Sequence, residues 1–131
     1  MIHITLPWPV SINALYRSVV KGKGKKAYST SILSKRGRQY FKDAGLAILC
    51  SGSRPKRPIE APVRLDIGLY PPTLRGYDCD NMVKCVQDAL THCNVWIDDS
   101  QVHILRVEKG PKFPGGKAEI TITILPVDKT E

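Results

Sequence analysis

The sequence predicts a mixed α/β fold of the α+β kind, in which a small mixed four-stranded sheet packs with two helices. Three observations support this class. Apolar and polar residues alternate over short segments, apolar residues recur at helical spacing over two longer ones, and one of these helical segments separates two of the expected strands. The length of 131 residues suits a single domain with a real hydrophobic core.

We expect four strands, at about residues 2–6, 63–69, 102–109 and 117–125. Pro7 ends the first strand, because proline has no N–H to donate to a sheet. A helical segment separates the second and third strands, which predicts a crossover unit with these two strands parallel in one sheet. A short connection rich in glycine and proline separates the third and fourth strands, which predicts a hairpin.

The two expected helices follow from apolar residues that recur every three or four positions. The first covers about residues 35–50, and Ser34 is its expected N-cap. The second covers about residues 80–93, with Asp80 as N-cap and one apolar stripe along its length. Trp96, shortly beyond this helix, is expected to be an anchor of the hydrophobic core.

Charge is divided unevenly along the chain. Of the formal net charge of +8, residues 1–58 contribute twelve basic side chains and one acid, whereas residues 59–131 contribute eight basic and eleven acidic ones. Because a basic surface attracts phosphate groups, the first half of the chain suits a nucleic-acid partner. The second half carries the acids that chemistry on a phosphate would need.

A cluster of basic residues falls in a stretch that contains two glycines and no acid. We expect a mobile surface loop over about residues 17–33, which binds phosphate and becomes ordered only on DNA. A solvated linker is the alternative interpretation of the same composition. The expected DNA-binding side chains of this loop are Arg17, Lys21, Lys23, Lys25 and Lys26.

Four carboxylates and one lysine gather in two short motifs, Asp78-x-Asp80-Asn-x-x-Lys84 and Asp98-Asp99. Carboxylates a few Å apart repel each other by roughly 4 kcal/mol per pair at an effective dielectric constant near 20, so a fold that gathers them usually holds a cation, typically a hard divalent metal. Asp78 and Asp80 project to the same side of an extended chain, and Lys84 lies on the helix face of Asp80. The crossover returns Asp99 to the same neighbourhood, where we expect the carboxylates to converge.

Each of these features also has a purely structural explanation. Asp80 can cap a helix, Asp80, Lys84 and Asp88 can form an i,i+4 ladder of ion pairs, and Asp98-Asp99 can form a turn. Together, these explanations leave open why the acids gather in a cationic protein. We assign Asp88 to a structural role alone. Two other functions remain as alternatives to a nuclease: a non-catalytic basic nucleic-acid-binding protein, and a metal phosphatase that would have little use for the basic first half.

These residues resemble the RusA family of Holliday junction resolvases, which are often encoded by prophages. The resemblance extends from about Ile4 to Ile124 and rests on three features: Asp78-x-Asp80-Asn81-x-x-Lys84, Trp96-x-Asp98-Asp99, and the opening Leu6-Pro7-Trp8-Pro9 with Asn13 and Tyr16-Arg17. It implies a homodimeric, magnesium-dependent endodeoxyribonuclease, with Mn²⁺ as a substitute for Mg²⁺. Its substrate would be the four-way DNA junction, cut by paired symmetric nicks in recombination and repair.

The resemblance also assigns roles when the motif is matched residue by residue. Asp78, Asp80 and Asp99 take the positions of the metal-binding acids, and Lys84 takes that of the essential lysine, whereas Asp98 receives no definite role. Family members often carry a run of arginines before the first aspartate, and this chain has Arg75-Gly76-Tyr77 there. DNA contacts at that edge, including that of Arg75, are therefore expected to be weaker or differently placed.

The sequence also suggests where the protein acts. No segment reaches the ~20 consecutive apolar residues of a membrane span, and the first residues lack the charged and apolar regions of a signal peptide. We therefore expect a cytoplasmic protein with no membrane partner.

Overall fold

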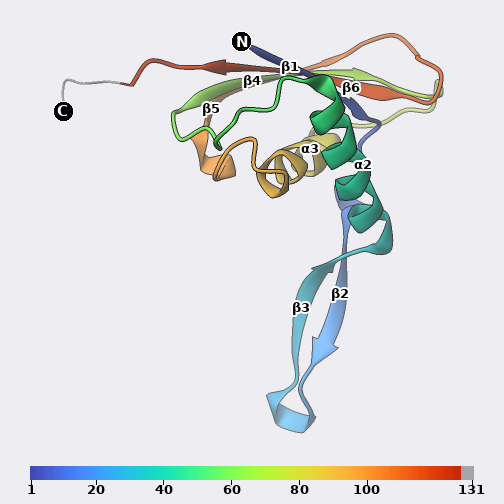
Figure 1. The fold of residues 1–131 in the computed structure, drawn as a ribbon. Helices are drawn as coiled ribbons and strands as arrows, with labels where there is room; N and C mark the ends of the chain where they lie inside the picture. The colour runs from blue at the N-terminus through green and yellow to red at the C-terminus, as the bar shows by residue number, and fades with distance from the viewer. Residues whose placement is uncertain (128–131) are drawn as a thin grey trace.

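The computed structural model describes residues 1–127 and contains the expected mixed four-stranded sheet. The strands of this sheet are β1 (Ile2–Pro7), β4 (Val63–Tyr70), β5 (Val102–Lys109) and β6 (Lys117–Ile124). The two long helices, α2 (Lys35–Ser51) and α3 (Asp80–His92), cover one face of the sheet (Figure 1). The α+β class, the four strands and both helices are therefore confirmed.

The strands lie in the order β1-β6-β4-β5. Strands β4 and β5 are parallel, with Leu65 opposite Leu105, and α3 connects them, which confirms the expected crossover unit. Strand β6 pairs antiparallel with both β1 and β4, so that Ile120 lies opposite Ile4 on one side and Ile67 on the other.

Our prediction that the last two strands, β5 and β6, form a hairpin is wrong, because β4 lies between them in the sheet. Residues 110–116 instead cross the end of β4, where Gly110 N–H donates to the carbonyl of Leu69 at 2.6 Å. Gly116 has a φ of +73°, and a Cβ atom there would lie 2.8 Å from Pro72 and 2.9 Å from Trp8. The glycines that suggested a tight turn thus serve a wider connection that passes close to other segments.

The hydrophobic core lies between the sheet and the two helices. Alternate residues of β4, Val63 to Leu69, are at most 2% exposed and face the helices, whereas the opposite face of the sheet carries polar residues such as Asp66, Glu119 and Thr121. Trp96 is fully buried, which confirms its expected role as a core anchor. No helix within residues 1–127 combines the length and the apolar character that crossing a membrane would require.

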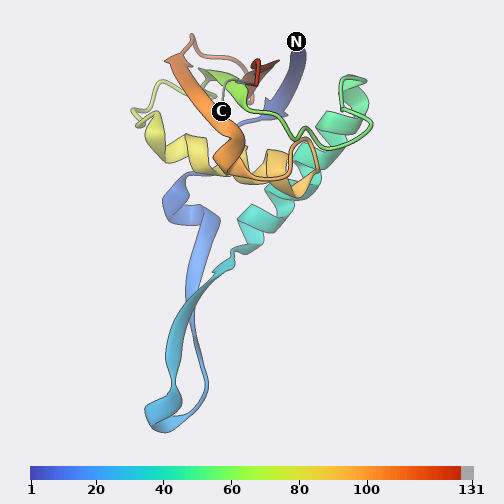
Figure 2. The same ribbon diagram turned by 90° about the vertical axis from the view of Figure 1, so that its left-hand side faces the viewer.

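The basic segment after residue 16 is not the loop that we expect from its composition. Strands β2 (Tyr16–Lys21) and β3 (Tyr28–Leu33) form an antiparallel hairpin, closed by the short 3₁₀ helix η1 (Gly24–Lys26), and this hairpin projects from the body of the molecule (Figures 1 and 2). The β-branched and aromatic residues on both sides of the turn favour strands. Gly22, at a φ of +85°, takes the left-handed conformation that the turn needs.

The base of the hairpin is attached to α2. Ser34 caps this helix as expected, since its hydroxyl accepts a hydrogen bond from Gly37 N–H at 3.0 Å, and the same hydroxyl donates to the carbonyl of Ala14. Gly37 allows the close approach, because a Cβ atom there would lie 2.7 Å from the carbonyl oxygen of Leu15. Ala14 and Leu15 belong to the one-turn helix α1 (Ile12–Leu15), which therefore joins the hairpin to the body.

Helix α3 begins and ends in ways that place the acidic motifs. Asp80 is its first residue and not its cap, which corrects our expectation: Cys79 occupies the N-cap position and makes no side-chain hydrogen bond. At the other end, Asn94 adopts a φ of +60°, and Val95 N–H donates to the carbonyl of Leu90 at 3.0 Å. This Schellman-type ending turns the chain into the core at Trp96.

Candidate active site

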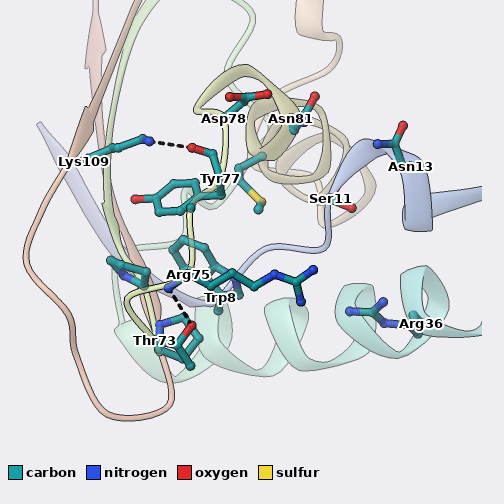
Figure 3. A pocket seen from close by; sticks show the side chains of 14 residues that line it. Trp8, Ser11, Asn13, Arg36, Thr73, Arg75, Tyr77, Asp78, Asn81 and Lys109 are labelled. Atoms are coloured by element: carbon teal, nitrogen blue, oxygen red, sulfur yellow. Dashed lines mark hydrogen bonds between the residues drawn. The ribbon is translucent and has the colours of Figure 1, made fainter.

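Asp78 lies at the rim of a cleft of about 810 Å³, in the loop between β4 and α3 (Figure 3). Tyr77, the preceding residue, fixes this loop: its ring stands edge-on to Trp8 with centroids 5.1 Å apart. The ammonium group of Lys109 lies 4.3 Å from the centroid of the same ring and donates to the carbonyl of Tyr77 at 2.5 Å. These contacts hold the backbone just before Asp78, whose side chain remains exposed.

The cleft is lined by cationic, aromatic and neutral polar side chains around that single acid. Its cations come from three separate segments, with Arg36 on the first turn of α2, Arg75 on the loop and Lys109 at the end of β5. Besides Asp78 and these three, the lining residues are Trp8, Ser11, Asn13, Pro71, Pro72, Thr73, Gly76, Tyr77, Asn81 and Met82.

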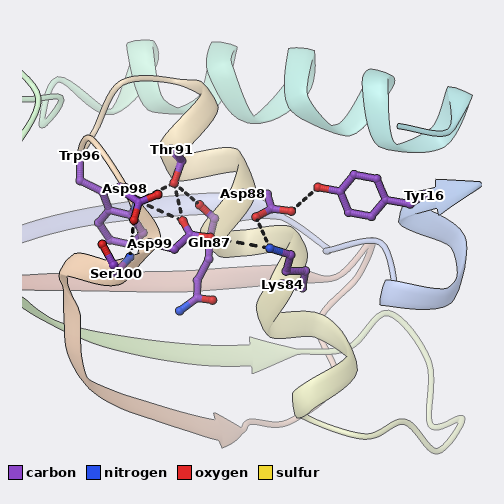
Figure 4. A network of polar contacts seen from close by, with 9 residues as sticks. All are labelled: Tyr16, Lys84, Gln87, Asp88, Thr91, Trp96, Asp98, Asp99 and Ser100. Atoms are coloured by element: carbon purple, nitrogen blue, oxygen red, sulfur yellow. Dashed lines mark hydrogen bonds and ion pairs between the residues drawn. The ribbon is translucent and has the colours of Figure 1, made fainter. Parts of the chain in front are cut away.

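Asp99 lies in a second polar cluster, near the C-terminal end of α3 (Figure 4). Its carboxylate accepts a hydrogen bond from the hydroxyl of Thr91, and the indole N–H of Trp96 donates to that hydroxyl at 2.7 Å. Trp96 Nε1 is also 3.4 Å from Asp99 Oδ1. Because Trp96 is fully buried in the core, these contacts orient the Asp99 carboxylate.

Asp98 has a structural role that its sequence position alone left open. It caps the 3₁₀ helix η2 (Asp99–Gln101), accepting from Ser100 N–H at 3.0 Å, while the Gln101 side chain accepts from the backbone of Asp98. The hydrogen bonds from Ser100 lower the pKa of Asp98. This capping box orients the turn that carries Asp99.

Lys84 joins the two acidic motifs. Its ammonium nitrogen lies 3.0 Å from Asp88 and 3.9 Å from Asp99 (Figure 4). The hydrogen bond to Asp88, assisted by the charges of Asp88 and Asp99, raises the pKa of Lys84 above its ordinary value. Lys84 is therefore a stable cation, and its side chain is still 46% exposed.

Tyr16, at the first position of β2, contacts the same cluster from the base of the hairpin. Its hydroxyl donates a hydrogen bond to the carboxylate of Asp88, whose side chain is only 12% exposed. Burial, followed by this hydrogen bond and the charge of Asp88, raises the pKa of Tyr16. A chain of contacts thus runs from Tyr16 through Asp88 to Lys84 and Asp99.

The structure brings some of the expected site residues together and leaves others apart. It unites Lys84 with Asp99, and Arg75 with Asp78 in the cleft. The expected convergence of three carboxylates is not found: residues 1–127 contain no group of three or more Asp, Glu, His or Cys side chains placed to hold a metal ion. Asp80 is exposed in the first turn of α3.

The expected DNA-binding residues of the basic segment, which lie on the hairpin, are all exposed. Four of them, Lys21, Lys23, Lys25 and Lys26, lie at or beside the turn that closes the hairpin, at the end farthest from the body of the molecule (Figure 2). Arg17 lies near the base of the hairpin, directly after Tyr16.

Our sequence-based set of site residues omits several residues of the cleft and of the Asp99 cluster, among them Asp88, Tyr16, Arg36 and Lys109. Asp88, assigned to structure alone, is the closer of the two carboxylates to Lys84, and the i,i+4 spacing was the available signal. Tyr16 is 72 positions from Asp88, and its place in this network has no local signal. Arg36 and Lys109 likewise reach the cleft only through the fold.

Comparison with known proteins identifies the family of this chain. The family model described as endodeoxyribonuclease RusA matches residues 9–125. The chain is 38% identical over 121 residues to the crossover junction endodeoxyribonuclease of Enterobacteria phage 82, and 37% identical over 125 residues to that of Escherichia coli strain K12, with 92% of each chain covered in both comparisons. The corresponding protein of Shigella sonnei is 36% identical over 125 residues. The chain therefore belongs to the RusA family of endodeoxyribonucleases.

Proposed function

We propose that this chain is a structure-selective endodeoxyribonuclease that resolves four-way DNA junctions by paired symmetric nicks in recombination and repair. Membership of the RusA family supports an endonuclease activity. The observation that carries the assignment to this site is the contact between Lys84 and Asp99, 3.9 Å apart. It joins two parts of the acidic motif that lie fifteen positions apart in the sequence.

Asp78, Asp80 and Asp99 are the proposed ligands of Mg²⁺, with Mn²⁺ as a substitute. Their carboxylate oxygens are the donors that hard divalent cations prefer. Mg²⁺ usually keeps several water ligands and binds through one or two carboxylates plus substrate phosphates, so a preformed cage of three carboxylates is not required. When bound, the ion would supply Lewis-acid polarisation of the phosphate and an activated water.

Lys84 is proposed to neutralise negative charge that develops on the scissile phosphate. It suits this role because a lysine is charged at neutral pH, and the hydrogen bond to Asp88 raises the pKa of Lys84 further. The same raised pKa makes Lys84 unsuitable as a general base. The hydrogen bond from Thr91 supports the role of Asp99 by holding that carboxylate beside Lys84.

The hairpin and the symmetry of the substrate suggest how DNA binds. We assign the arms of the junction to the exposed basic side chains of the hairpin, namely Arg17, Lys21, Lys23, Lys25 and Lys26. Because the two nicks fall in strands of like polarity, two equivalent sites are needed, and a two-fold symmetric homodimer would supply them. Light scattering of the free protein should then give about twice the protomer mass of 14.6 kDa.

A gel assay tests the function directly. A labelled four-way junction is incubated with the protein in Mg²⁺, in Mn²⁺ and in EDTA, and a linear duplex of the same sequence serves as control. Paired nicks in the junction alone, with either metal but not with EDTA, are expected. A protein that shifts the junction on a native gel and leaves it intact with both metals would instead be the non-catalytic nucleic-acid-binding protein.

A further inference from the structure

We propose that the cleft beside Asp78 is a binding site for one DNA strand, whose phosphodiester backbone is held by Arg36, Arg75 and Lys109. The inference rests on the proposed function and extends it, because it separates the strand that is cut from the duplex arms held by the hairpin. Neither Arg36 nor Lys109 belongs to the acidic motif or to the basic hairpin. We call this site the Asp78 cleft, with the lining residues given above.

The charge of the Asp78 cleft points to an anionic ligand. Three cationic side chains from three segments share the lining with one carboxylate. Within residues 1–127, Arg36, Arg75 and Lys109 form no ion pair with any acid. Within this part of the chain no carboxylate therefore neutralises the three charges. Guanidinium groups match phosphate oxygens with two parallel hydrogen bonds, and Lys109, which also donates to the carbonyl of Tyr77, has further N–H groups to offer.

The size of the cleft points to a single strand. A volume of about 810 Å³ is near the upper end of the roughly 300–1,000 Å³ range of small-ligand sites, which suits a short stretch of nucleotides. A strand opened at the branch point of a junction can supply such a stretch.

The walls of the cleft suit the other parts of a nucleotide. Trp8 and Tyr77 form an aromatic wall, in which Tyr77 contacts Trp8 edge-on and the ammonium group of Lys109 lies over its ring. Asn81 lies beside Asp78, and Asn13 lies across the cleft from the aromatic wall (Figure 3). The amides of both offer neutral hydrogen-bonding groups. Aromatic walls with a cationic track are the usual means of holding single strands.

Arg36 brings to the cleft a positive charge from a helix that is distant in the sequence from the loop before Asp78. The loop before Asp78 carries only Arg75, and the fold brings Arg36 from α2 and Lys109 from β5 to the same space. Figure 3 shows the guanidinium groups of Arg36 and Arg75 on the same side of the cleft, with Asp78 across from them. A DNA strand whose phosphates contact these two cations would therefore pass Asp78, which is proposed to take part in cutting that strand.

Arg36→Ala and Lys35→Ala form a matched pair for the test. Both residues are exposed in the first turn of α2 and each substitution removes one positive charge, but only Arg36 lines the cleft. Junction binding is measured over a range of salt concentrations, and single-turnover nicking is measured in Mg²⁺. Arg36→Ala should weaken binding roughly ten-fold and reduce the salt slope by about one, because one phosphate contact is lost. Lys35→Ala should do neither.

Tryptophan fluorescence gives an independent readout. Trp8 lines the cleft, whereas Trp96, the only other tryptophan of the chain, is fully buried. The single-stranded oligonucleotide (dT)₄ should change the emission of the wild-type protein, and the change should disappear in Trp8→Phe, which retains Trp96. Circular dichroism checks that Trp8→Phe is folded; if it is not, the test is the loss of the (dT)₄ response in Arg36→Ala and its retention in Lys35→Ala.

The outcomes separate this inference from the proposed function. If the wild-type protein nicks junctions and the two α2 variants bind, nick and respond to (dT)₄ alike, the cleft is not the strand site and the function stands. If the wild-type protein does not nick junctions but (dT)₄ still alters Trp8 emission in an Arg36-dependent way, the function is wrong and the cleft remains a strand site.

Discussion

Lys84 and Asp88 form an ion pair across one turn of α3, and this pair places the lysine beside Asp99. The Lys84 nitrogen lies 3.0 Å from Asp88 and 3.9 Å from Asp99. Asp88 is itself held from the other side by the hydroxyl of Tyr16. The lysine proposed for catalysis is therefore positioned by a carboxylate that our sequence analysis assigned to structure alone.

Asp88→Asn should slow nicking without weakening DNA binding. The amide cannot hold the ammonium group as the carboxylate does, so Lys84 would sample other rotamers, and a displacement of about 1 Å in a catalytic group can cost up to roughly a hundred-fold in rate. Single-turnover nicking and junction affinity are measured separately, and Asp88→Glu should restore part of the rate. Asp43→Asn, an equal charge change at an exposed position of α2, is the control. Equal rates for the Asp88→Asn and Asp43→Asn proteins would show that Asp88 does not position Lys84.

Tyr16→Phe should have a milder effect of the same kind. The substitution removes one hydrogen bond to Asp88 and keeps the Lys84–Asp88 ion pair, so the rate should fall between those of the wild type and Asp88→Asn. Losing a hydrogen bond to a partly buried carboxylate should also cost about 1 kcal/mol in the free energy of unfolding. Urea unfolding and single-turnover nicking give the two values, and an unchanged rate together with reduced stability would limit Tyr16 to a structural role.

Asp78→Asn should abolish nicking while junction binding persists or becomes tighter. The carboxylate is a proposed metal ligand, and it is also the one acid among the cations of its cleft. Removing its charge lowers the repulsion of DNA phosphates while the fold is kept, because the side chain is exposed. Full nuclease activity in this variant, measured on a labelled junction in Mg²⁺, would contradict the role of Asp78 in the site.

The elements that the sequence predicts well are those with local signals. Helix α2 with its Ser34 cap depends on neighbouring residues, and the β4-α3-β5 crossover follows from the order of the segments. The pairing of β6 with β4 had no such signal, because the glycines of residues 110–116 suit both a tight turn and a wide connection. In the basic segment, composition was misleading: two glycines suggested a mobile loop, whereas the β-forming residues on either side of them pair as strands.

The residues of the candidate site likewise fall into those with a local sequence signal and those without one. The acidic motif and Lys84 are visible in the sequence, as is the i,i+4 spacing that links Lys84 to Asp88. The contact of Tyr16 with Asp88 depends on how the hairpin base packs on α3 and has no signature in either segment. The same is true of Arg36 and Lys109, which meet at the cleft from the start of one helix and the end of one strand.

Thiol reactivity should distinguish two of the four cysteines. Cys50 is exposed, whereas Cys85 is fully buried, and burial raises the pKa of the Cys85 thiol from 9.0 to about 12. Because the thiolate is the reactive form, a thiol reagent at pH 8 should modify Cys50 quickly and Cys85 only on unfolding. Peptide mapping after timed labelling checks this order, with Cys50→Ser as the control that lacks the fast phase. Rapid native labelling of Cys85 would contradict its burial and the hydrogen bond that its sulfur accepts from Val10 N–H at 3.4 Å.

Two glycines of α2 should respond to alanine with opposite signs. At Gly37 a Cβ atom would lie 2.7 Å from the backbone oxygen of Leu15 and 2.8 Å from Leu33 Cδ1, so Gly37→Ala should destabilise the fold by about 1–3 kcal/mol. At Gly45 the nearest atom is the sulfur of Cys93 at 3.6 Å, an ordinary contact, so Gly45→Ala should stabilise it by about 0.5–1 kcal/mol through helix propensity. Urea unfolding of both variants gives the two values. Because Gly37 contacts residues at the base of the hairpin, Gly37→Ala should also lower the affinity for the junction. A Gly37→Ala protein as stable as the wild type would mean that the hairpin does not pack on α2 as described.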